Sequence, residues 1–151
     1  LAERWPTLAA QIRQRFGLPT LMLGGPGDCA AAAEITTLAG GRIINLVGQT
    51  SLLTAAALIE RARLLVGVDT GLSHMGIVFR RPSVLLFGST CPYTETGQRN
   101  ARVLYHPRSC SPCRRRPTCD GAFSCMRDID VDEVMATLAA LPGVAGAGAS
   151  Q

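Results

Sequence analysis

The chain has 151 residues, of which 47% are hydrophobic and 17% are charged, and its formal net charge is +4. This length suits one domain, and the composition excludes an intrinsically disordered protein. No apolar run reaches the roughly 18–20 residues of a membrane-spanning helix, and no basic segment followed by an apolar one opens the chain as a signal peptide would. The sequence begins at Leu1 in mid-pattern and not at a Met, so we expect a piece of a longer protein.

Helical and strand patterns alternate along the chain. Apolar residues recur at helical spacing over residues 3–16, and Gly17 is the expected end of that helix. Asp28, Ser51 and Asp130 are candidate N-caps of later helices. Those later helices are predicted over residues 29–39, 52–63, 70–80 and 131–141. Short apolar runs that predict strands cover residues 19–25, 42–48, 64–68, 83–88 and 101–106.

Short apolar strands that alternate with helices are typical of a parallel sheet covered by helices on both faces. We therefore predict an α/β fold with a Rossmann-like doubly wound parallel sheet. This domain is expected over residues 1–140, with a cysteine-rich loop over 108–127. The Gly- and Ala-rich segment 141–151 is expected to be a flexible tail.

In such folds ligands bind beyond the carboxyl ends of the strands. Gly25 and Asp28 follow the first predicted strand, where a glycine allows a ligand close to the backbone and a carboxylate can accept hydrogen bonds from a ribose diol. Asp28 could instead serve only as a helix N-cap. Gly48 and Gln49 follow the second strand and offer backbone groups to the edge of an adenine.

The end of the third predicted strand carries the densest polar chemistry. Asp69 closes the strand, and Thr70, Gly71 and Leu72 form the first turn of the next helix. Their unpaired N–H groups and the helix dipole make a site for a diphosphate, to which the Thr70 hydroxyl adds a donor. His74 follows one turn later, where it can hold a ligand or bond a backbone carbonyl. The pattern is neither a Walker loop nor the GxGxxG fingerprint.

These motifs resemble glycosyltransferase family 9, the ADP-heptose:lipopolysaccharide heptosyltransferases. The shared signature is Asp-Thr-Gly-Leu-x-His over residues 69–74, followed by RPSVLLFGST over 81–90. RWP and LGGPGD upstream and the cysteine-containing segment downstream also fit, so the resemblance covers about residues 1–140.

The resemblance implies the C-terminal, donor-binding half of a GT-B enzyme that transfers heptose from ADP-heptose to the lipopolysaccharide inner core with inversion. Asp28 would hold the ribose hydroxyls, and Asp69 and His74 would face the phosphate or the sugar. The diphosphate would lie against Thr70, Gly71 and Leu72.

The same resemblance places the catalytic base, a carboxylate, on the N-terminal domain and no catalytic residue in this chain. We therefore expect the chain alone to bind donor weakly and to transfer nothing. It also implies a cytoplasmic protein, with contact to the inner face of the inner membrane. Since no carboxylate cluster accompanies Asp69, no metal or other cofactor is expected in catalysis.

Four of the six cysteines form a Cys-x2-Cys-x5-Cys-x5-Cys pattern, namely Cys110, Cys113, Cys119 and Cys125. In a cytosolic protein this pattern favours a structural zinc or iron ion over disulfides, and reduced free thiols are the alternative. Six arginines and no acidic residue lie between Thr96 and Cys119. They favour an anionic partner, which could be a phosphate-bearing substrate, a membrane surface or nucleic acid, or else they form a solvated loop.

Two other classes of function fit parts of the sequence. A nucleic-acid-binding module would explain the basic cysteine-rich loop, but that loop lacks aromatic side chains that stack on bases, so we predict no nucleic-acid partner. Another GT-B sugar-nucleotide enzyme, or a sugar-nucleotide epimerase, would use the same scaffold. Fold alone does not separate these enzymes.

Overall fold

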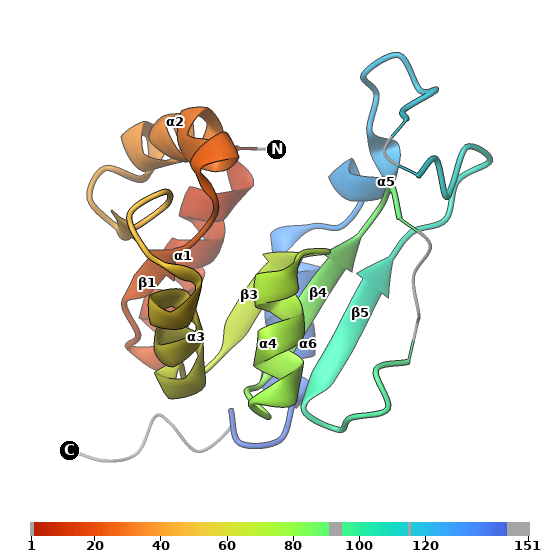
Figure 1. Cartoon of the computed structure of the whole chain (residues 1–151). Helices are drawn as coiled ribbons and strands as arrows, with labels where there is room; N and C mark the ends of the chain where they lie inside the picture. Colours follow the sequence, from red (N-terminus) through yellow and green to blue (C-terminus); the bar gives the residue numbers. More distant parts are fainter. Residues whose placement is uncertain (1, 91–94, 115, 145–151) are drawn as a thin grey trace. The chain divides into compact units, whose positions relative to one another are not determined.

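The computed structural model describes residues 2–90, 95–114 and 116–144. Its helices are α1 (Arg4–Phe16), α2 (Cys29–Ala39), α3 (Leu52–Arg61), α4 (Gly71–Val78), α5 (Ser124–Arg127) and α6 (Val131–Ala140) (Figure 1). Its strands are β1 (Thr20–Met22), β2 (Ile43–Asn45), β3 (Leu65–Val68), β4 (Ser83–Phe87) and β5 (Ala101–Tyr105). Every element predicted from the sequence is present. The short 3₁₀ helix η1 (Pro26–Asp28) and α5 were not predicted.

The described residues form two compact units, 2–58 and 59–144, and α3 runs across the boundary between them. In unit 1, β1 and β2 pair in parallel from Thr20 opposite Ile43 to Met22 opposite Asn45. The apolar faces of α1 and α2 pack against this two-stranded sheet and form the core of unit 1. It contains Ala9, Ile35, Ala39 and Ile43. The pairing brings the carboxyl ends of β1 and β2, and the turns that follow them, to one edge of this unit.

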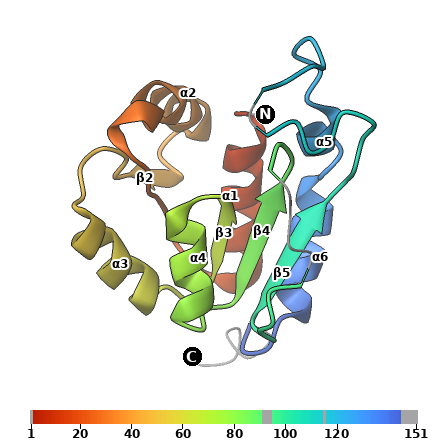
Figure 2. The same cartoon turned by 45° about the vertical axis from the view of Figure 1, so that its right-hand side comes forward.

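Unit 2 is a three-stranded parallel sheet in the order β3-β4-β5. Helix α4 covers one face and α6 the other, as the two views in Figures 1 and 2 show. Leu85, Phe87 and Ala101 form the core of the sheet, and Leu138 of α6 is also fully buried. Coverage of both faces by helices confirms the Rossmann-like doubly wound fold class.

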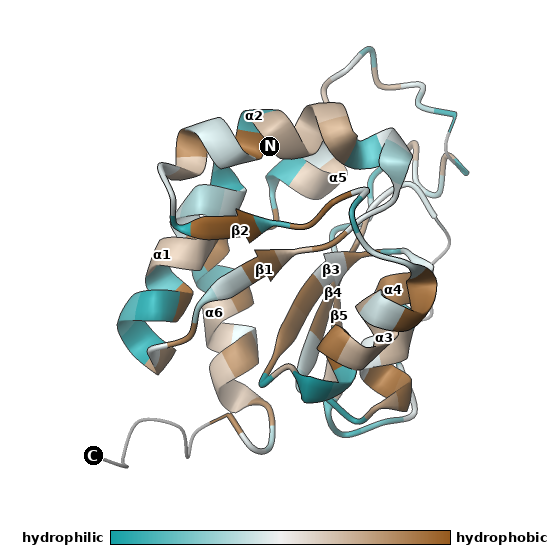
Figure 3. Cartoon of the chain, turned by 60° about the vertical axis from the view of Figure 1, so that its left-hand side comes forward, coloured by the Kyte–Doolittle hydropathy of each residue, from teal (hydrophilic) through white to brown (hydrophobic). Residues whose placement is uncertain are grey.

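The strands are coloured mainly as hydrophobic in Figure 3, as expected for a sheet that is covered on both faces. Close packing of α4 on β4 depends on Gly76, because a Cβ atom there would lie 2.7 Å from the Ser83 hydroxyl. The Ser83 side chain is completely buried and its hydroxyl donates to the Arg81 carbonyl at 2.8 Å.

Two of the three expected N-caps are confirmed. Ser51 Oγ accepts from the Thr54 N–H at 3.1 Å, and Asp130 Oδ1 accepts from the Glu133 N–H at 2.7 Å. Asp28 does not cap α2 with its side chain, so that expectation was wrong. Its backbone lies in the helical region (φ −94°, ψ −2°), whereas a capping residue is extended, because η1 already curls the chain ahead of α2.

Among the described residues, no helix combines the length and the apolar character that crossing a membrane requires. Of the segment expected to be a flexible tail, Leu141 and Val144 are buried. Residues 145–151 lie outside the described residues.

Candidate functional site

The N-terminus of α4 lies at the carboxyl end of β3 in unit 2. Thr70 is extended (φ −142°, ψ 163°), and its hydroxyl makes no capping bond, so the side chain is available to a ligand. The N–H groups of Ser73 and His74 donate to the Thr70 carbonyl at 3.1 and 3.3 Å. Within the described part of the chain, the N–H groups of Gly71 and Leu72 have no acceptor. Because Thr70 and Gly71 are exposed, these donors can reach an anion from solvent.

The carboxylate of Asp69 lies beside the imidazole of His74. Asp69 Oδ1 and His74 Nε2 are 3.1 Å apart, and the side chains are 23% and 43% exposed. The sequence suggested a ligand contact or a backbone carbonyl as the partner of His74 and did not predict this pair. Both residues remain open to solvent, so they can contact a bound ligand while each orients the other.

Ser73 and Gly67 also shape this turn, and the sequence analysis missed both. Ser73 is 2% exposed, and its hydroxyl donates to the Val68 carbonyl at 2.6 Å and lies 3.4 Å from Thr70 Oγ1. A Cβ atom on Gly67 would overlap the Ser73 hydroxyl. Glycine in the strand therefore makes room for the hydroxyl that ties α4 to the end of β3. A serine in the first turn of a helix, six residues after a strand glycine, was the available sequence signal.

The residues expected to bind ribose and adenine lie together at the strand ends of unit 1. Asp28 Oδ2 accepts from the Gly25 N–H at 2.9 Å, and its other carboxylate oxygen has no donor among the described residues. The Gly48 N–H donates to the Gly24 carbonyl at 3.1 Å, which joins the two turns. Gly48 itself has a left-handed φ of 71°. The Gln49 side chain donates to the Asn45 carbonyl at 3.0 Å, and the Gln49 N–H donates to the Leu46 carbonyl at 3.1 Å.

Unit 2 also contains a cavity of about 370 Å³ beyond the carboxyl ends of β3 and β4. Asp69 borders it, as do Ser89 and Thr90. The buried Thr90 hydroxyl has no hydrogen-bond partner among the described residues. Gly88 forms part of the wall, and a Cβ atom there would lie 2.6 Å from Met126 Sδ. The wall of the cavity is mainly apolar and carries a few polar groups, among them the carboxylate of Asp69.

The four cysteines of the predicted cluster line this same cavity, and all are partly buried free thiols. Burial raises the pKa of the Cys125 thiol, and the nearby thiols of Cys110, Cys113 and Cys119 raise it further, against a lowering effect of the Met126 backbone. Within the described ranges, no three Cys, His, Asp or Glu side chains are arranged around a common point as metal ligands.

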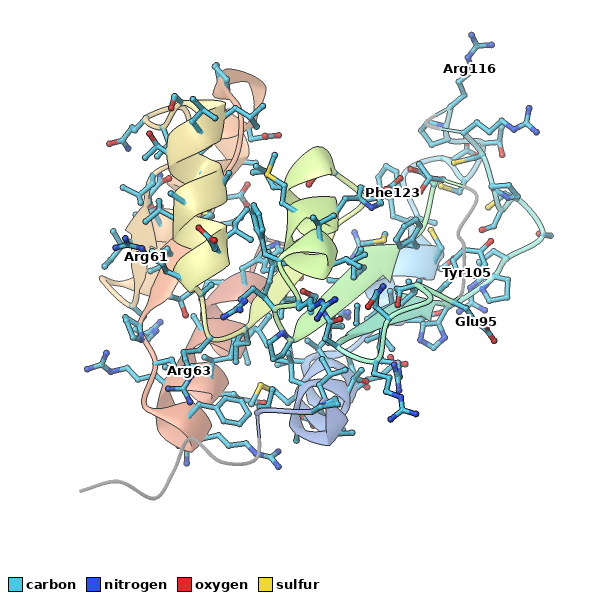
Figure 4. All side chains as sticks on the ribbon, turned by 60° about the horizontal axis from the view of Figure 1, so that its bottom comes forward. Arg61, Arg63, Glu95, Tyr105, Arg116 and Phe123 are labelled. Atoms are coloured by element: carbon cyan, nitrogen blue, oxygen red, sulfur yellow. The ribbon has the colours of Figure 1, made fainter. Side chains whose placement is uncertain are left out.

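The arginines of the basic segment have different environments. Arg108 forms an ion pair with Asp128, so the carboxylate of Asp128 neutralises its positive charge. The exposed Arg114 ties the loop to β4 through its N–H, which donates to the Ser89 carbonyl at 2.7 Å. Arg116 projects outward from the tip of the loop (Figure 4). Arg115 lies outside the described residues.

The sequence model of "Glycosyltransferase family 9 (heptosyltransferase)" matches residues 1–122. The chain belongs to this family. Lipopolysaccharide heptosyltransferase 2 of Escherichia coli K12 is 30% identical over 150 residues, which cover 93% of this chain and 43% of that protein. The chain thus spans less than half the length of this family 9 relative.

Solved structures of family 9 proteins share the fold. E. coli ADP-heptose lipopolysaccharide heptosyltransferase II superposes with a TM-score of 0.73 at 27% identity, over 93% of this chain and 40% of that one. The family 9 glycosyltransferase of Veillonella parvula gives a TM-score of 0.69 at 26% identity, over 91% and 40% of the two chains. The family resemblance and the fold class inferred from the sequence are confirmed.

Proposed function

We propose that this chain binds the ADP-heptose donor of a reaction that transfers heptose to the lipopolysaccharide inner core. The observation that carries the proposal is the exposed start of α4 in a family 9 chain. There the free N–H groups of Gly71 and Leu72 lie beside the Thr70 hydroxyl and the Asp69–His74 pair. A helix N-terminus with free donors suits a diphosphate.

The free oxygen of Asp28 accepts from the ribose hydroxyls, while Gly25, Gly48 and the Gln49 backbone border the adenine. The diphosphate lies on the start of α4, and the sugar lies toward Asp69. The Thr90 hydroxyl, which has no hydrogen-bond partner among the described residues, is buried in the wall of the adjoining cavity and is the candidate partner of a sugar hydroxyl there.

In the transfer itself, an acceptor hydroxyl attacks the anomeric carbon, the bond from that carbon to the diphosphate breaks, and the configuration inverts. Negative charge grows on the departing diphosphate, and fixed N–H donors stabilise that charge most in the transition state. Asp69 is the only carboxylate among the lining residues of the cavity, which favours transfer without a catalytic metal.

We assign the remaining parts of the reaction to residues that this 151-residue chain does not contain. The family 9 relatives are more than twice as long as the matched segment. We assign the general base and much of the acceptor site to an N-terminal domain, so the chain alone binds donor and transfers nothing. Acceptor contact places the enzyme in the cytoplasm at the inner membrane, where Arg114 and Arg116 face anionic groups.

Calorimetric titration of the chain with ADP, UDP and a DNA oligomer tests the proposal. ADP should bind more tightly than UDP. Thr70→Val should weaken ADP binding and lower thermal stability only slightly, because the hydroxyl caps no helix N–H and makes one long hydrogen bond, to Ser73 Oγ at 3.4 Å. Thr37→Val, on the exposed surface of α2, is the matched control and should bind ADP like the parent.

Three results would refute the donor assignment. One is equal affinity for ADP and UDP, and another is unchanged ADP affinity in Thr70→Val. The third is salt-sensitive DNA binding with no nucleotide binding, which would instead support the nucleic-acid module.

A further inference from the structure

The unit 2 cavity contains an aromatic side chain to which the donor contacts described above assign no role. Phe123, labelled in Figure 4, is 39% exposed and lines this cavity. It is the one aromatic residue among the described residues of the lining. Small-ligand pockets are lined mainly by apolar and aromatic side chains, and a ring in such a wall can bury its open face against the ligand.

The backbone fixes the position of this ring at some cost. Phe123 has φ 44° and ψ 36°, in the left-handed region that is unfavourable for a bulky residue. Its carbonyl accepts from the N–H groups of Met126 and Arg127, both at 2.9 Å, and these bonds hold the conformation at the start of α5. Glycine or asparagine would adopt the same conformation with less strain. Strained residues of this kind concentrate at ligand-binding sites.

The rest of the lining combines apolar side chains with a few polar groups. Val68, Leu86 and Met126 contribute apolar surface. Asp69 contributes a carboxylate, and Thr90 a buried hydroxyl with no hydrogen-bond partner among the described residues. A sugar ring has the same division, with C–H groups on its faces and hydroxyl groups around its edge. Each C–H carbon also bears oxygen, so its hydrogen carries partial positive charge, which the negative face of an aromatic ring attracts.

Asp69 connects the cavity to the proposed diphosphate site. It lines the cavity and directly precedes Thr70 and Gly71 at the start of α4. In a sugar nucleotide the sugar is bonded directly to the diphosphate, so a diphosphate at the start of α4 brings the sugar next to Asp69. The cavity volume of about 370 Å³ lies near the lower end of the roughly 300–1,000 Å³ of small-ligand pockets, which suits one sugar unit.

We propose that Phe123 is a specificity residue for the donor and that its ring stacks on a C–H face of the transferred sugar inside the cavity. This role rests on the proposed donor function. Phe123 contacts the sugar and not the nucleotide, so it raises the affinity for the sugar nucleotide above that for ADP. Stacking also holds the sugar ring in one orientation, in which the Thr90 hydroxyl meets the edge of the sugar.

Calorimetric titration of the chain with ADP and with ADP-heptose tests this role. The parent should bind ADP-heptose more tightly than ADP. Phe123→Leu keeps an apolar side chain but removes the aromatic face, so it should bind ADP-heptose roughly threefold to tenfold more weakly and ADP with unchanged affinity. Phe123→Tyr keeps the ring and should bind ADP-heptose like the parent.

Phe16→Leu is the matched control, because it makes the same change at a partly buried position in unit 1. It should bind both ligands like the parent, with circular dichroism as the check on folding of every variant. Nuclear Overhauser contacts between the Phe123 ring protons and the heptose C–H protons test the stacking in the parent chain without any substitution.

Absence of those contacts would overturn the role of Phe123, and so would equal ADP-heptose affinity of Phe123→Leu and the parent. An equal loss of ADP and ADP-heptose affinity in Phe123→Leu would also overturn it, since a structural role alone produces that result. If the parent binds ADP but gains nothing from the heptose, the sugar site fails while the nucleotide site stands. If the parent binds neither ligand, the donor function fails and the role of Phe123 fails with it.

Discussion

The contact between Gly67 and Ser73 predicts a strong energetic coupling at the start of α4. In Gly67→Ala, the new methyl group overlaps the Ser73 hydroxyl, which cannot turn away because it is buried and bonded to the Val68 carbonyl. The φ of Gly67 lies outside the left-handed region, so the backbone itself accepts alanine. Overpacking of this kind costs about 1–3 kcal/mol of unfolding free energy.

The second single variant and the double variant complete the cycle. Ser73→Ala removes one hydrogen bond, a loss of about 0.5–1.5 kcal/mol. Val68 is 40% exposed, so water can replace the donor and the loss should fall in the lower half of that range. In Gly67→Ala/Ser73→Ala, the closest remaining atom of residue 73 is its Cβ, at an ordinary 3.4 Å. Replacing glycine by alanine in a strand also raises the free energy of unfolding by roughly 0.5–1 kcal/mol. The double variant should therefore lose less stability than Gly67→Ala alone, with a coupling of about 2 kcal/mol.

Urea unfolding followed by far-ultraviolet circular dichroism measures all four free energies, with a constant m-value as the check on a common transition. Gly71→Ala combined with Ser73→Ala is the matched control, because a Cβ atom on Gly71 meets nothing within 4 Å. That pair should be additive. Additivity of the Gly67 and Ser73 variants within about 0.5 kcal/mol would refute the steric explanation.

Three further predictions concern the donor site, a helix cap and a thiol. Gly71→Ala should raise stability slightly, by at most about 1 kcal/mol, because alanine favours a helix over glycine and its methyl group meets nothing within 4 Å. The same variant should weaken ADP binding about tenfold, or 1.4 kcal/mol, by calorimetry, because the methyl group occupies ligand space. Asp130→Ala should lose about 0.5–2 kcal/mol in thermal unfolding, whereas Asp130→Asn, which keeps an acceptor for the Glu133 N–H, should lose much less. The alkylation rate of Cys125 in metal-free chain should reach its midpoint above the ordinary thiol pKa of about 8.5, and a midpoint at or below it would contradict the burial argument. Because this pKa is raised on folding, its stabilising contribution is present below the ordinary thiol pKa and is lost as the pH rises through the folded value.

Local patterns in the sequence are enough to predict the strands and the long helices of this chain. The apolar runs and helical periodicities have enough length to specify each element, and Ser51 and Asp130 cap helices as expected. The Asp-Thr-Gly-Leu-x-His motif directs attention to the start of α4. The sequence predicted a side-chain cap at Asp28 that the structure lacks, because the conformation of Asp28 depends on η1. A 3₁₀ helix of three residues is too short to give a periodic pattern in the sequence.

Contacts between distant segments required the folded chain. The Asp69–His74 pair depends on how tightly the chain turns from β3 into α4, and the fit of Ser73 beside Gly67 depends on the packing of that helix on the strand. The spacing of the four cysteines predicted that they cluster, but nothing in the sequence predicted that they lie near Asp69. They share one cavity with it because the parallel strands β3 and β4 end at the same edge of the sheet, where the segment that follows β5 folds back over them.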